Sequence, residues 1–380
     1  MKTYRYRVPT TVHLKEGAIQ NLFACFPPLG RRPLIVCGHH SARTTGALEV
    51  LLRQMPEAIV FEDVEANPSD TTCERGAAFC RQRGCDWIMG LGGGSPIDAA
   101  KAIALLAPHG GLCRDYYAQA PDTALPLVAI PTTAGTGSEV TPYSVLVDTT
   151  EKAKRTLRGE MLFPRHAILD PLLTVSMPRA VTIATGLDAL SQGMEGLVSR
   201  FSTEVGDVLA LEVCRLVKQW LPVAVQAPEN VEARGQMLHA AMLSGCVIAQ
   251  SRTTLVHSLG YYYTLEFGIA HGLANALLLA PVFRYNARHA PDKVAALAAA
   301  LGVRCPATPD AAAGAITRAI HALLGELGVS PAAEDAGVRT DRLPEFAAQI
   351  YQDRSRFTTQ PGDPNEEDVR QFFLDSAEGA

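Results

Sequence analysis

Short apolar runs alternate with amphipathic stretches through the first half of the chain. Four apolar runs of strand length each predict a buried strand: residues 33–37, 58–61, 87–91 and 127–130. Helical patterns lie between these runs, notably at residues 47–54 and 72–83. Because strands that alternate with helices pair in parallel, this half predicts an α/β domain in which helices cover a parallel sheet.

The pattern changes near residue 181, where apolar residues begin to recur at helical spacing and strand signals fade. Helices are predicted from this point onward, among them residues 183–199, 205–220, 232–248, 294–301, 310–327 and 364–376. Pro178 and Arg179 precede the change and mark a domain boundary. We therefore expect two domains, an α/β domain over residues 1–180 and an all-helical domain over residues 181–380.

Composition and charge exclude several classes of protein. The 380 residues are enough for two cores, and a net charge of −5 without a basic stripe argues against nucleic-acid binding. The apolar run at residues 277–282 is too short to span a membrane, and the first ten residues lack the apolar core of a signal peptide. The nine cysteines lack a paired metal spacing, which is typical of reduced thiols. We expect a cytoplasmic protein that binds neither membranes nor nucleic acid.

Three consecutive glycines, residues 92–94, join the third predicted strand to the helix that follows it. Ser95 is expected to be the N-cap of that helix, with Pro96 in its first turn and Asp98 three residues after the cap. Glycines let the backbone approach a ligand closely, and a helix start offers N–H groups to an anion. The loop therefore predicts a diphosphate site; the alternative is a tight turn without a ligand.

A second loop follows the fourth predicted strand and is rich in hydroxyl groups. Its sequence, PTTAGTGSE at residues 131–139, contains Thr132, Thr133, Thr136 and Ser138 together with two glycines. Hydroxyls at the carboxyl end of a strand suit a ribose or a phosphate, although a simple turn would also fit the pattern. The second loop strengthens the prediction of a bound nucleotide.

The helical half contains the candidates for a metal site. Asp188 and Gln192 are four residues apart, so they share a helix face. His257 and His271 are fourteen residues apart, which in one straight helix would separate them by about 21 Å.

The two glycines between these histidines, Gly260 and Gly268, could end one helix and begin the next. Such a turn would bring both imidazoles to one point. An aspartate and two histidines around an open position suit a divalent transition metal that acts as a Lewis acid. The alternative is a solvated polar pair on one helix and two structural histidines.

Four motifs taken together resemble the iron-containing (group III) alcohol dehydrogenases: GGGSPIDAAK, PTTAGTGSEVTPYS, GLDALSQGMEG, and the stretch from VHSLG to IAHGLAN. The resemblance covers nearly the whole chain. It implies a dinucleotide-binding α/β domain, a helical metal-binding domain, and a homodimer or larger homo-oligomer. The implied activity interconverts a small alcohol and an aldehyde with NAD or NADP.

The resemblance also assigns the catalytic centre. Asp188, His257 and His271 match three of the four metal ligands, whereas Gln192 stands where the family normally has histidine. An amide oxygen donates more weakly than imidazole, so we expect weaker retention of Fe²⁺, a shift toward another ion such as Zn²⁺, or loss of the metal. Tyr261 replaces a histidine that the family often has, which rules out a proton relay through a histidine there.

Cofactor choice depends on the residues after the strand at 33–37. NAD-preferring relatives usually have an aspartate there, whereas this chain has Gly38, followed by Ser41 and Arg43. Without an acid, a 2′-phosphate could be held by Ser41 and Arg43, so we predict NADP over NAD; otherwise Arg43 is a solvated helix residue. Lys154 lies near the position where relatives place a basic residue beside the cofactor; alternatively, it is one charge in the solvated run 151–158. The expected cofactor-binding residues are Gly38, Ser41, Gly92, Gly93, Gly94, Ser95, Asp98, Thr132, Thr133, Ser138 and Lys154.

The resulting hypothesis is reversible hydride transfer between a small alcohol or aldehyde and the nicotinamide, assisted by the metal. Two alternatives stay open at this point. One is a metal-independent reductase on the same fold, as in the maleylacetate reductases. The other is a nucleotide-binding protein that kept both loops and lost the chemistry.

Overall fold

The computed structural model describes residues 3–304 and 308–380, and the contacts within it divide the chain into two compact units. The α/β unit comprises Arg7–Pro178 and Pro228–Gly245. The helical unit comprises the segment up to Tyr6 together with Arg179–Ala227 and Cys246–Ala380. Helix α7 (Val231–Ser251) therefore begins in the α/β unit and ends in the helical unit.

The α/β unit is built on a six-stranded sheet, and every neighbouring pair in it is parallel. In spatial order its strands are β1 (Thr11–Leu14), β8 (His166–Leu169), β5 (Leu127–Pro131), β4 (Trp87–Gly92), β2 (Pro33–Cys37) and β3 (Ile59–Phe61). A separate antiparallel hairpin contains β6 (Tyr143–Asp148) and β7 (Ala153–Arg158). The predicted parallel sheet is confirmed; strands β1 and β8 and the hairpin were not predicted.

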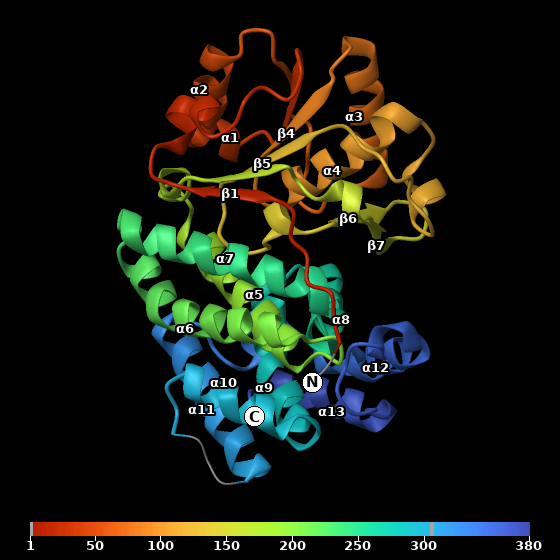
Figure 1. Ribbon diagram of the computed structural model, residues 1–380. Helices are drawn as coiled ribbons and strands as arrows, with labels where there is room; N and C mark the ends of the chain where they lie inside the picture. Colours follow the sequence, from red (N-terminus) through yellow and green to blue (C-terminus); the bar gives the residue numbers. More distant parts are fainter. Residues whose placement is uncertain (1–2, 305–307) are drawn as a thin grey trace. The chain divides into compact units, whose positions relative to one another are not determined.

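Helices cover both faces of this sheet (Figure 1). The side chains of Leu34 and Val36 pack on α3 (Asp70–Arg83) and α4 (Gly94–His109). Their neighbours in β2 point to the opposite face, toward a layer made of the 3₁₀ helix η1 (Ala18–Ala24), α1 (Ser41–Thr44) and α2 (Ala47–Gln54). Because both faces are buried, the central strands are apolar throughout, which is why they could be recognised in the sequence.

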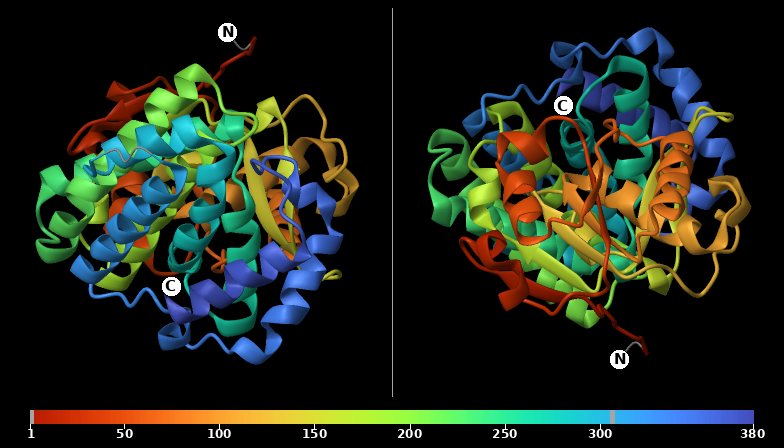
Figure 2. Two further views of the ribbon diagram at one scale, coloured as in Figure 1. Left: turned by 90° about the horizontal axis from the view of Figure 1, so that it is seen from below. Right: turned by 90° about the horizontal axis from the view of Figure 1, so that it is seen from above.

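The helical unit contains the remaining helices: α5 (Arg179–Val198), α6 (Glu204–Gln226), α8 (Leu255–Phe267), α9 (His271–His289), α10 (Pro291–Ala300), α11 (Pro309–Glu326), α12 (Leu343–Gln352) and α13 (Glu366–Glu378). Helix α9 lies at its centre, in contact with α5, α8, α11 and α13 (Figure 2). This unit confirms the predicted all-helical second half. Among the described residues, no helix combines the length and apolar character needed to cross a membrane.

Two histidines meet where β1 pairs with β8. Nε2 of His13 lies 3.3 Å from Nδ1 of His166, and the ring of His166 stacks on Phe26 at a centroid distance of 4.6 Å. Burial lowers the pKa of His166, and the nearby His13 and Arg165 lower it further. The folded protein therefore resists protonation of this ring.

This site predicts a loss of stability in mild acid. An unfolded histidine takes up its proton near pH 6.5, whereas folded His166 does so only at lower pH. Its contribution to the free energy of unfolding is therefore complete above about pH 6.5 and is lost as the pH falls through the lowered pKa. In urea unfolding, H166F, which keeps a ring over Phe26, should lose less stability between about pH 8 and about pH 5.5 than the wild type. An equal loss in both proteins would exclude His166 as the titrating group.

Candidate functional site

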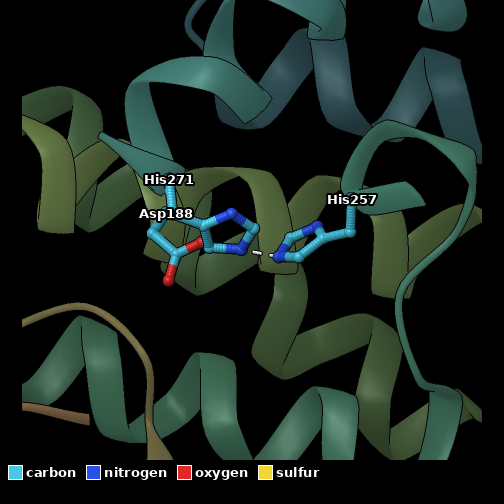
Figure 3. Close-up of side chains that lie close together, drawn as sticks. All are labelled: Asp188, His257 and His271. Atoms are coloured by element: carbon cyan, nitrogen blue, oxygen red, sulfur yellow. Dashed lines mark ion pairs between the residues drawn. The ribbon is translucent and has the colours of Figure 1, made fainter. Parts of the chain in front are cut away.

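Three side chains that bear metal-ligand atoms point toward one another in the helical unit (Figure 3). Asp188 lies on α5, His257 on α8 and His271 at the start of α9, and one ligand atom from each lies within 4.8 Å of the others. Oδ1 of Asp188 is 3.4 Å from Nε2 of His257 and 4.0 Å from Nε2 of His271. Two ligands bound tetrahedrally at about 2.1 Å lie roughly 3.4 Å apart, so donor set and spacing fit a divalent ion.

The turn between α8 and α9 brings the two histidines together. Gly268 ends α8 in the left-handed conformation, with φ of 68°, and His271 begins the next helix. The expectation that Gly260 also ends a helix was wrong, because Gly260 lies inside α8. A Cβ at Gly260 would lie 2.2 Å from Oδ1 of Asn275 on α9. Glycine at this position therefore allows α9 to approach α8 closely.

Two amides surround the carboxylate of Asp188. Gln192, one turn later on α5, donates from Nε2 to Oδ2 of Asp188 at 3.2 Å. Asn275 donates from Nδ2 to Oδ1 at 3.1 Å and lies 3.3 Å from Nε2 of His271. The ring of Tyr261 stacks on His271 at a centroid distance of 5.1 Å. Gln192 thus reaches the cluster from the predicted helix face, with its amide nitrogen toward the carboxylate.

The electrostatics of this cluster favour a positive charge. Burial alone would raise the pKa of Asp188, but a hydrogen bond with His257 and the charges of both histidines together lower it. Burial alone would lower the pKa of His257, but Glu195 and Asp188 together raise it to about 10. The raised pKa favours a protonated His257 ring between these two carboxylates. A divalent cation bound there would replace one of the ring protons.

Glu195 and Asn275 belong to this cluster and were missed by the sequence reasoning. Glu195 lies seven residues after Asp188 on α5, and Asn275 lies four residues after His271 on α9. Both spacings put the residue on the same helix face as a predicted metal ligand, and this spacing could have identified both residues in the sequence. Both side chains are fully buried, and each makes a hydrogen bond to a residue of the cluster.

In the α/β unit, the glycine loop leads directly from β4 into α4. Gly92 has φ of 143°, Gly93 is the N-cap, and the helix begins at Gly94. The prediction of Ser95 as N-cap was wrong, because the glycines start the helix before it. The Ser95 hydroxyl instead accepts a hydrogen bond from the backbone N–H of Asn67 at 3.1 Å.

The two predicted loops lie against each other. The backbone N–H of Thr132 donates to the carbonyl oxygen of Gly92 at 2.9 Å. A Cβ at Gly93 would lie 3.3 Å from Thr133, and one at Gly94 would lie 2.7 Å from Thr136. Oγ1 of Thr132 is buried and has no hydrogen-bond partner within the described ranges. A helix N-terminus beside an unsatisfied hydroxyl fits an anionic ligand such as a diphosphate.

Asp98 and Ser138 bond to each other beneath these loops. The hydroxyl of Ser138 donates to Oδ1 of Asp98 at 2.5 Å, and the backbone N–H of Val145 donates to Oδ2 at 3.1 Å. Lys101, which is fully buried, donates to Oγ of Ser138 at 2.8 Å. Burial raises the pKa of Asp98 and, despite that carboxylate, lowers the pKa of Lys101 to about 8. Both oxygens of Asp98 are therefore engaged inside the α/β unit.

The other predicted cofactor residues lie near the ends of β2 and β7. Gly38 follows β2, and a Cβ there would lie 2.9 Å from the carbonyl oxygen of Val64. Ser41 begins α1, and its Oγ would lie 3.5 Å from a Cβ at Gly92. Lys154 lies on β7 and is one of the charges that lower the pKa of Asp98 against burial.

Arg43 is already paired with a carboxylate. Its guanidinium donates from Nη2 to Glu62 at 2.6 Å and lies 3.8 Å from Glu49. Both Arg43 and Glu62 are substantially exposed. A phosphate at this place would compete with Glu62 for the guanidinium.

Comparison with known proteins identifies the family of the chain. Two family models match: "iron-containing alcohol dehydrogenase" over residues 9–171 and "Fe-containing alcohol dehydrogenase family, C-terminal" over residues 182–377. The 1,3-propanediol dehydrogenase of Klebsiella pneumoniae is 36% identical over an alignment of 385 positions, gaps included, which covers 98% of each chain. The NAD-dependent methanol dehydrogenase of Bacillus methanolicus is 31% identical and covers 91% of this chain and 93% of its own.

The similarity extends to the three-dimensional structure. A crystal structure of 1,3-propanediol oxidoreductase matches with a TM-score of 0.93 and 32% identity, covering 99% of this chain and 100% of the other. The parallel sheet and the helical second half agree with this match. The chain therefore belongs to the iron-containing alcohol dehydrogenase family of oxidoreductases.

Proposed function

We propose that the protein interconverts a small alcohol and its aldehyde, with a nicotinamide dinucleotide as hydride carrier and a divalent ion in the helical unit. The convergence of Asp188, His257 and His271 carries the proposal, because a carboxylate and two imidazoles are donors that suit Fe²⁺ and Zn²⁺. The substrates named for the relatives, 1,3-propanediol and methanol, support a small alcohol.

Asp188, His257 and His271 would hold the ion, with Gln192 as the fourth ligand. A bound ion of this kind supplies Lewis-acid polarisation of an alcohol or carbonyl oxygen. Gln192 now turns its amide nitrogen toward Asp188, so coordination through Oε1 requires rotation of the amide. Asn275 supports the carboxylate through its own amide hydrogen bond. We propose Fe²⁺ as the ion, with Zn²⁺ as the alternative.

The α/β unit would hold the dinucleotide. Its diphosphate would lie against the glycines at 92–94 and the first turn of α4, where the buried hydroxyl of Thr132 is also available. Asp98 and Ser138 would act by holding the two loops together through their mutual hydrogen bond. Gly38, Ser41, Ser95, Thr133 and Lys154 are proposed as further contacts.

For the choice between NADP and NAD, we predict NADP. Position 38 has no acidic side chain that would repel a 2′-phosphate, and the carbonyl oxygen of Val64 leaves little room for any side chain there. Arg43 could turn from Glu62 to bind the 2′-phosphate. R43A should lower kcat/KM about tenfold with NADPH and leave it unchanged with NADH, because it removes one charged hydrogen bond. E62Q, which weakens the pairing of Arg43 with residue 62, should raise kcat/KM with NADPH relative to kcat/KM with NADH. A wild-type protein that prefers NADH would contradict the prediction.

The activity is tested by reduction of propanal, followed through the absorbance of the reduced nicotinamide. We expect turnover with purified protein and reversal with 1-propanol and the oxidised cofactor. Cofactor binding without turnover of propanal or any other short aldehyde would contradict the proposed function.

Three features of the wider protein are also proposed from the family resemblance. The chain would form a homodimer or larger homo-oligomer, and it would work in the cytoplasm. Residues 1–180 would bind the cofactor and residues 181–380 the metal. Light scattering measures the oligomeric state, cell fractionation locates the protein, and binding assays on the intact protein test for the cofactor and the metal.

A further inference from the structure

A buried carboxylate on α5 holds the start of α8. Oε1 of Glu195 accepts hydrogen bonds from N and Oγ1 of Thr254, at 2.8 Å and 2.9 Å, and from N of His257 at 3.2 Å. Thr254 is the N-cap of α8, but its hydroxyl makes no capping bond within its own helix. Glu195 therefore satisfies N–H groups that a helix start leaves without intrahelical partners.

The other oxygen of the same carboxylate contacts the ring of His257. Oε2 of Glu195 is the partner of Nδ1 of His257, while Nε2 of this ring lies 3.4 Å from Oδ1 of Asp188. An ionised carboxylate only accepts hydrogen bonds, so Nδ1 carries the hydrogen in this contact. Nε2 is then the ring atom that faces the metal-ligand cluster.

We propose that Glu195 is a positioning residue of the candidate metal site. It fixes the start of α8 through one oxygen and the orientation of His257 through the other, so that Nε2 is presented to the ion. This inference rests on the metal site of the proposed function. Asp188 and Glu195 project from the same face of α5, and together they hold opposite edges of one imidazole ring.

Replacement of Glu195 with glutamine tests this role with little change in shape. In E195Q the amide oxygen can still accept from Thr254 and His257 N–H groups, which leaves the amide nitrogen to donate to Nδ1 of His257. The neutral ring must then carry its hydrogen on Nε2, the atom needed for the metal. We expect the Kd for Zn²⁺, measured by competition with a chromophoric chelator, to rise by about 10–100-fold. Because E195Q also removes a buried negative charge beside His257, the two Kd values are compared at a temperature at which both metal-free proteins are folded.

T254V is the matched control. It removes the hydroxyl that donates to Oε1 of the same carboxylate but leaves the contact between Glu195 and His257. We expect unchanged Zn²⁺ affinity in this variant, with at most a modest loss of stability. Equal Zn²⁺ affinity in E195Q and wild type would overturn the positioning role of Glu195 but not the metal site. A wild-type protein that binds no divalent ion would instead overturn the metal site itself.

Nitrogen NMR of ¹⁵N-histidine in the Zn²⁺-loaded protein separates positioning from a simple effect of charge. In the wild type, His257 should coordinate through Nε2 and retain a proton on Nδ1, and this measurement needs no variant. In metal-free E195Q, the neutral ring should instead carry its proton on Nε2 and none on Nδ1. Coordination of the wild-type ring through Nδ1, or an unchanged Nδ1 proton in a weakly binding E195Q, would overturn the proposal.

Discussion

Replacement of His271 with alanine is expected to remove the divalent ion and, with it, the reduction of aldehydes. In the described part of the chain, ligand atoms of Asp188, His257 and His271 lie within 4.8 Å of one another. H271A would therefore leave one acid, one imidazole and the weakly donating Gln192 to hold the ion. Loss of outer contacts to a metal costs about 10–100-fold in affinity, and loss of a direct ligand should cost at least about 100-fold. Metal content after desalting and kcat/KM for propanal measure this effect.

His289 provides the matched control for this substitution. It lies at the other end of α9, where its ring stacks on Tyr285. H289A should therefore keep both the metal and the activity. If H271A retained metal and turnover at the wild-type level, His271 could not be a ligand.

Replacement of Gln192 with histidine is expected to have the largest effect in the opposite direction. Gln192 is buried one turn after Asp188, and its amide already contacts that carboxylate. An imidazole on the same helix face would add a stronger donor to the cluster, so we expect the Kd for Fe²⁺ or Zn²⁺ to fall by about 10–100-fold. The measurement is again competition with a chelator, made under anaerobic conditions for Fe²⁺.

Q192L separates coordination from packing. Leucine fills a similar volume but offers no donor atom, so Q192L should bind the ion more weakly than the wild type if the glutamine oxygen coordinates. Identical affinities for Q192H, Q192L and the wild type would show that position 192 does not face the ion.

The sequence predicted the central strands well because burial on both faces makes them apolar throughout. The predicted strand at residues 33–37 coincides with β2, and the other three differ from the structure by one residue at an end. Strands β1 and β8 escaped recognition because they are four residues long and contain His13 and His166. The hairpin of β6 and β7 has one partly exposed face, and its charged residues on β7 suggested a solvated run instead.

Local patterns were less informative about the site, because its contacts form only when helices pack. The turn at Gly268 was predicted correctly, whereas Ser95 and Gly260 were misassigned because local rules do not register how closely another segment approaches. Lys101 was read only as part of a loop motif, and nothing in its neighbourhood indicated complete burial. The role of Glu195 depends on a partner 62 residues away.

The protein belongs to the iron-containing alcohol dehydrogenases, and the most direct test of its proposed mechanism is whether its activity depends on a metal ion. Metal content and NADPH-dependent reduction of propanal should be measured before chelation, after chelation and after return of Fe²⁺ or Zn²⁺. We predict that the purified protein contains a divalent ion, that chelation abolishes turnover, and that the returned ion restores it. A metal-free protein with undiminished activity would contradict this account and would identify a metal-independent reductase on the same fold.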